Sequence, residues 1–189
     1  MRRALLDSAH PSSSCSSSAL PGGHVFLLIL LFALVAAIVA VGLCGYGGRT
    51  LADHGLRRAS VPAVLRGLAA LAGAGACALY AWGLLALCGA VMTAEDGGTD
   101  SSPPRSCRTA GWSERHRQGI EIVDYEVTYL PPAFVCETSD GGSYDTGEVP
   151  GFVNPAVLSL ALAAAGGAIG SGYVTELRAR AEFREQQAG

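Results

Sequence analysis

Three long runs of apolar residues dominate the chain, at 24–48, 67–92 and 155–175. None of them contains an aspartate, a glutamate or an arginine. A helix needs about 20 apolar residues to cross roughly 30 Å of hydrocarbon, so each run is long enough to span a membrane. A buried core helix would explain one such run, but three of them leave too little polar chain, in 189 residues, to cover them in water. The pattern predicts a mainly helical membrane protein with three transmembrane helices.

A different pattern occurs between the second and third runs, in the loop at 93–154. Along 123–129, apolar and aromatic residues alternate with polar ones, which is typical of a half-buried strand. Pro131 and Pro132 then interrupt pairing, because neither has a backbone N–H. The strand pattern resumes after them, and the glycine-rich sequence TSDGGS precedes a further short strand. These features predict a small β-hairpin unit at about 119–149. The first strand is expected to place on one face Val123, Tyr125, Val127 and Tyr129.

Two or three short strands are marginally stable alone, so the hairpin needs a second source of order. Three of the six cysteines lie within the apolar runs and one lies near the N-terminus, which leaves Cys107 and Cys136 in the loop. A disulfide between them would stabilise the unit by roughly 3–4 kcal/mol in the chain-entropy account. The alternative is two unpaired thiols. We expect the bond, because the topology that the arginines predict places this loop on the extracytoplasmic, oxidising side of the membrane.

The arginines predict the topology. They cluster in the segment at 49–66 and in the tail at 176–189, and short arginine-rich segments stay on the cytoplasmic side. With three spans, the N-terminus is then outside, the C-terminus is cytoplasmic and the loop at 93–154 is extracytoplasmic. That loop carries eleven carboxylates against four arginines, a net charge of −7. Arg2 and Arg3 favour the opposite orientation, but they lie far from the first span.

The first 23 residues form a serine-rich segment with no hydrophobic periodicity, which predicts a disordered tail. A wrongly assigned start codon is an alternative explanation for this segment. The first apolar run is longer than a usual signal-peptide core, and Leu43 precedes Cys44 where a lipoprotein signal needs a small residue. We therefore expect a retained helix rather than a cleaved signal.

Small residues recur at four-residue spacing in all three apolar runs. Such rows let helix backbones approach closely in a membrane, where lipid competes with every other apolar contact. In the first two runs, an alanine- and glycine-rich genome explains the rows as well as helix packing does. In the third run packing is favoured, because glycine is costly in a helix without a packing reason. The positions expected to serve packing are Gly73, Gly166, Gly167 and Gly170.

Composition supports the membrane assignment and narrows the function. Half of the residues are hydrophobic, only 7% are aromatic, and the mean hydropathy is +0.34. All 13 basic residues are arginine, which together with the alanine and glycine content suggests a GC-rich bacterial genome. Basic and aromatic residues are not interleaved, so nucleic-acid binding is not expected.

The sequence carries no strong signal for catalysis or for a cofactor. The four histidines are far apart, and neither a CxxC pair, a GxSxG nucleophile motif nor a phosphate-binding glycine loop is present. Asp140 and Asp145 lack the regular spacing of a calcium loop. We therefore expect no catalytic residues, no bound metal and no cofactor.

The leading hypothesis is a non-catalytic interaction or assembly protein of the bacterial cell envelope, in the plasma membrane. Its partners would be membrane lipid and another membrane or envelope protein, bound through the extracytoplasmic loop. One alternative is a membrane thiol–disulfide exchange enzyme that uses Cys107 and Cys136, and another is an accessory subunit of a transport complex. The aromatic residues expected to form the interaction surface are Tyr125, Tyr129, Phe134 and Tyr144.

Overall fold

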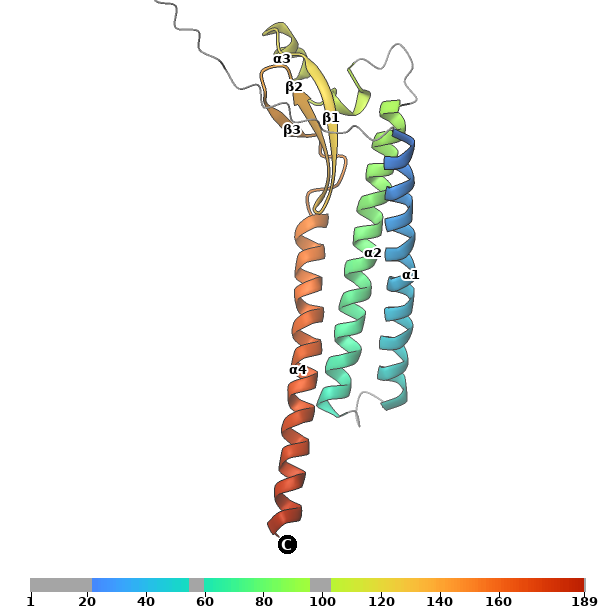
Figure 1. Cartoon of the computed structure of the whole chain (residues 1–189), viewed down its shortest axis with the longest axis vertical. Coiled ribbons are helices and arrows are strands. Elements are labelled where there is room, and N and C mark those ends of the chain that lie inside the picture. Colours follow the sequence, from blue (N-terminus) through green and yellow to red (C-terminus); the bar gives the residue numbers. More distant parts are fainter. Residues whose placement is uncertain (1–21, 55–59, 96–102, 189) are drawn as a thin grey trace, which may run out of the picture.

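The computed structural model describes residues 22–54, 60–95 and 103–188 (Figure 1). The N-terminal tail, up to residue 21, lies outside this range, as do Arg57 and Arg58. In chain order the elements are α1 (Gly22–His54), α2 (Val61–Glu95), the short 3₁₀ helix η2 (Arg105–Cys107), α3 (Trp112–Arg117), β1 (Ile122–Tyr129), β2 (Pro132–Thr138), β3 (Ser143–Asp145) and α4 (Val153–Ala188).

The predicted fold class is confirmed. The chain has three long apolar helices. Between the second and the third of them in sequence lies a small antiparallel sheet, and the Cys107–Cys136 disulfide joins this sheet to η2. Each helix is long and apolar enough to cross a membrane, as expected for a multi-pass membrane protein. The helices also extend beyond the apolar runs. The end of α4, after Thr175, is an exposed helix on which Arg180 pairs with Glu176 at 2.8 Å.

Helix α2 is the central helix of the bundle, with α1 on one side and α4 on the other (Figure 1). Small residues form both contacts. A β-carbon added at Gly167 of α4 would lie 2.9 Å from that of Ala69, and one added at Gly47 of α1 would lie 2.9 Å from the carbonyl oxygen of Gly67. Contacts this short leave no room for a side chain, so glycine at these positions lets the helices approach closely.

Hydroxyl groups within the apolar helices bond to their own backbone. Ser171 is almost fully buried and donates to the carbonyl of Ala168 at 2.8 Å, and Thr175 donates to the carbonyl of Ser171 at 2.8 Å. Thr175 also accepts a hydrogen bond from Arg66, which links α2 to α4 at the end of the bundle away from the sheet. These bonds satisfy polar groups that lipid cannot.

Helix α4 begins beside α2 about two-thirds of the way along α2, not at its end. Its first residue, Val153, packs against Gly83, where an added β-carbon would lie 3.4 Å from the valine side chain. The part of α2 beyond Gly83 extends about a further 18 Å, at 1.5 Å per residue. The sheet lies beside this part of α2, above the start of α4 (Figure 1). The sheet therefore packs beside the part of α2 that α4 does not cover.

The sheet has the strand order β1-β2-β3, with both pairs antiparallel. Tyr129 pairs with Pro132, so Leu130 and Pro131 form a two-residue turn. The two prolines therefore form the turn between β1 and β2 and the start of β2, and they do not interrupt a single strand. Pro131 follows a cis peptide bond.

The predicted orientation of one side chain in the first strand is wrong. Val123 was expected on the same face as Tyr125, but its side chain is 62% exposed. The pairing shifts by one residue between Ile122 and Asp124, which is a β-bulge with Val123 as the extra residue. Ile122 takes the inward position in its place and packs against the core.

We expect Gly167→Leu to destabilise the helix bundle, because the new side chain would overlap Ala69. Overpacking of this kind typically costs about 1–3 kcal/mol. The matched control is Gly166→Leu, because a β-carbon at Gly166 would meet no atom within 4 Å. Thermal or denaturant unfolding in the same detergent should show a lower midpoint for the Gly167 variant alone. Equal effects of the two substitutions would contradict this packing.

Candidate functional site

The candidate site is the sheet unit, which we define as residues 103–152 with η2, α3 and the three strands. Its centre is the disulfide between Cys107 of η2 and Cys136 of β2, whose α-carbons lie 5.9 Å apart. Both cysteines are fully buried, as is Phe134 on the same face of β2. These side chains continue into the core that Leu87 and Val91 of α2 form. The disulfide predicted from the sequence is confirmed, and it lies where the unit meets α2.

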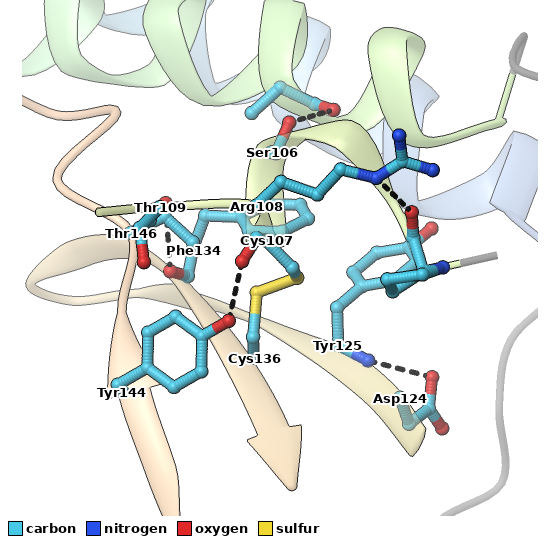
Figure 2. Close-up of a disulfide and its surroundings, with 12 residues drawn as sticks. Ser106, Cys107, Arg108, Thr109, Asp124, Tyr125, Phe134, Cys136, Tyr144 and Thr146 are labelled. Carbon is cyan, nitrogen blue, oxygen red and sulfur yellow. Dashed lines mark hydrogen bonds between the residues drawn. A yellow bond between two sulfur atoms is a disulfide. The ribbon is translucent and has the colours of Figure 1, made fainter. Parts of the chain in front are cut away.

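Tyr144 of β3 holds the η2 segment against the sheet. Its hydroxyl donates to the carbonyl of Cys107 (Figure 2). The guanidinium of Arg115 lies over the ring of Tyr144, 4.3 Å from its centroid, and also donates to Thr109 at 3.2 Å. This cation–π contact fixes α3 against the sheet. Cys107 is thus held by a covalent bond and by a hydrogen bond from a neighbouring strand.

The aromatic residues expected on the interaction surface lie mostly inside the unit. Phe134 is fully buried, and the ring of Tyr125 stacks on it with centroids 4.9 Å apart. Tyr129 contacts Phe32 of α1 at 6.1 Å between centroids and accepts a hydrogen bond from Tyr80 of α2 at 3.0 Å. The aromatic rings therefore pack the unit and dock it on the helices, and other residues form its exposed surface.

That exposed surface is acidic. No basic residue occurs between Arg117 and Glu176. The strands and their turns therefore contain carboxylates but no basic side chain. The unit's arginines belong instead to η2, α3 and the residues beside them. The exposed carboxylates of the strands and turns are Glu121, Asp124, Glu126, Glu137, Asp140, Asp145 and Glu148. Glu114 of α3 is also exposed, but it pairs with Arg117 at 2.8 Å.

The turn between β2 and β3 is held by Asp140. Its carboxylate accepts hydrogen bonds from the Thr138 hydroxyl and from the backbone N–H of Gly142, the latter at 3.1 Å. The Thr138 bond, followed by the Gly142 bond, holds the pKa of Asp140 below its usual value, because both favour the charged form. The residue is a structural carboxylate of the turn.

The glycines expected to serve helix packing fall into two groups. A β-carbon at Gly73 would lie 3.2 Å from Leu43 of α1, and Gly167 lies against Ala69. At Gly166 and Gly170 an added β-carbon would meet nothing within 4 Å. These two glycines therefore lie away from the helix contacts within this chain.

Sequence reasoning missed the residues that dock the unit on the helices. Gly83 of α2 lies against Pro132 and Val153, and Tyr80 and Phe32 contact Tyr129. One signal was present, because a tyrosine hydroxyl within an apolar helix needs a hydrogen-bond partner. Tyr80 finds that partner in the backbone of the sheet unit.

The chemistry available to the unit is limited. Among the described residues, no group of three or more histidine, cysteine or acidic side chains is placed to hold a metal ion. A thiolate cannot reach either sulfur of the disulfide in the folded unit, because both cysteines are fully buried, and this disfavours thiol–disulfide exchange. No protein-family model, curated protein or solved structure matches the chain.

We expect the double variant Cys107→Ala with Cys136→Ala to lose most of the stability of the sheet unit. The loss should be roughly 3–4 kcal/mol, comparable with the whole stability of so small a unit. The measurement is the rate at which a protease cuts the loop in membranes. Cys44→Ala is the control, because Cys44 is an exposed free cysteine on α1. A double variant as resistant as the parent would contradict the role of the bond.

Thr138→Val should raise the pKa of Asp140 part of the way to its usual value, because the bond from Gly142 remains. The folded-state pKa lies below the unfolded one, so Asp140 stabilises the turn above its unfolded pKa. That stability is lost as the pH falls through the folded pKa. Carbon-13 NMR titration of the Asp140 carboxyl in the two proteins measures the change. An unchanged titration midpoint would rule out the Thr138 hydroxyl as the main cause.

Proposed function

We propose that the chain is a multi-pass protein of the bacterial plasma membrane that binds another membrane or envelope protein through its sheet unit. In this proposal the unit is extracytoplasmic, the N-terminus is outside and the C-terminus is cytoplasmic. The role is recognition or assembly, without catalysis. The observation that carries the proposal is a small disulfide-bonded unit that packs on α1 and α2 and exposes an acidic surface and an edge strand.

Two features support this orientation. Arg66 lies at the end of the bundle opposite the sheet, where it bonds to Thr175, and Arg178, Arg180 and Arg184 follow on the same end of α4. Arginines flanking membrane spans favour the cytoplasmic side. At the other end, a buried disulfide persists in an oxidising compartment. Both features favour a sheet unit outside the cell.

The form of the unit supports recognition. Its core is fixed by the disulfide and by the contacts of Tyr129 with α1 and α2, so its surface is preorganised and binding orders little further chain. β1 is an edge strand, with exposed Val123 between the carboxylates of Glu121 and Asp124. An edge strand offers its backbone to a partner strand, and the surrounding negative charge favours a partner with basic groups.

Site-specific photo-cross-linking in native membranes tests the proposal. A photoreactive benzoylphenylalanine replaces Val123 or Glu126, both exposed on β1, in the full chain. We expect an adduct of the same mass from both positions, because one partner would cover this edge. Lysine substitution of Asp124 should reduce the yield, because it replaces a negative charge by a positive one.

The matched control is the same photoreactive group at Leu162, which is exposed on α4 away from the sheet. No adduct of the sheet partner is expected from that position. The proposal fails if the β1 positions give no adduct. It also fails if Leu162 gives the same adduct with equal yield, because the association would then depend on the helices.

A further inference from the structure

The turn between β1 and β2, residues 129–132, lies beside the middle of α2. Tyr129 bonds to Tyr80, whose nearest charged neighbours along α2 are Arg66 and Glu95. Each is about 20 Å from Tyr80 along the helix axis, at 1.5 Å per residue. On α1, Tyr129 contacts Phe32, which also lies within the uncharged run. The turn is therefore level with helix segments that have the composition of a membrane interior.

The outward side of this turn is apolar. Leu130 is 86% exposed, the highest value among the large hydrophobic residues described, and Pro131 beside it is also exposed. The neighbouring face of α1 is exposed and apolar as well, through Leu28, Leu31, Phe32 and Val35. The tip of the hairpin thus continues the surface that the helix presents to lipid. A leucine this exposed would be unfavourable in water.

The backbone of the turn is also suited to lipid, where unpaired polar groups are costly. Pro131 and Pro132 have no N–H. The carbonyl of Tyr129 accepts the hydrogen bond from Tyr80, and the carbonyl of Pro131 accepts one from the hydroxyl of Thr128 at 3.0 Å. Two backbone carbonyls of the turn thus accept hydrogen bonds from side-chain hydroxyls instead of from the backbone of a neighbouring strand.

Charge sets the depth of this segment. No charged residue occurs from Val127 to Val135, and the first ones along the two strands are Glu126 and Glu137. Glu126 is three residues from Tyr129, about 10 Å at the rise of a strand. We propose that the β1–β2 turn enters the hydrocarbon of the bilayer leaflet on the sheet side, with Leu130 in contact with lipid chains and Glu126 outside. The sheet unit is then fixed by the membrane as well as by the helices.

Depth-dependent fluorescence quenching tests the insertion. The full chain with Trp82→Phe and Trp112→Phe, which removes both native tryptophans, receives Leu130→Trp and is reconstituted in phosphatidylcholine vesicles. The substitution does not disturb packing, because the side chain is exposed. We expect blue-shifted emission, strong quenching by phosphatidylcholine brominated on its acyl chains, and weak quenching by acrylamide in the buffer.

Val123→Trp in the same background is the matched control, because Val123 is an exposed residue near the other end of β1. It should show the opposite pattern, with strong acrylamide quenching and several-fold weaker quenching by brominated lipid. Leu130→Trp that behaves like this control overturns the proposal, because the turn would then be in water. Protection of Leu130→Trp from both quenchers also overturns it, because protein would then cover the turn.

Discussion

The bond between Cys107 and Cys136 joins the segment that follows α2 to the middle strand of the sheet, and the rest of the sheet unit depends on it. A unit of about fifty residues buries too little apolar surface to order three short strands by packing alone. The disulfide restricts the unfolded chain and brings η2 against β2. Phe134 then completes the core, and Tyr144 and Arg115 close it from the side of β3 and α3.

The second constraint is that α2 contacts both of the other long helices and the sheet unit. Small residues let α1 and α4 approach it closely, as at Gly67 and Ala69, and the other part of α2 supports the sheet unit through Leu87 and Gly83. Because α4 begins at the level of Gly83, the sheet lies directly beside α2 and not on a flexible connection above it. The position of any surface on the unit is thereby fixed relative to the helices.

Local patterns in the sequence predicted much of this fold. Absence of charge marked the spans, a period of two marked the strands, and elimination among six cysteines identified the disulfide. The failures concern orientation, which local pattern does not contain. A bulge turns Val123 outward, and only the rotation of α4 against α2 distinguishes Gly167 from Gly166. The burial of Phe134 and the docking of Tyr80 depend on contacts between segments far apart in the chain.

Hydrogen–deuterium exchange of β2 in the oxidised full chain, reconstituted in vesicles, tests most directly whether the unit and the helices form one ordered body. Amides of β2 should exchange slowly, as those of α2 do, because the strand is paired on both sides and packs on that helix. Reduction of the disulfide should then make β2 exchange rapidly while α2 stays protected. Rapid exchange of β2 with the disulfide intact would contradict the account, because the unit would then be an unstructured loop closed by a covalent bond.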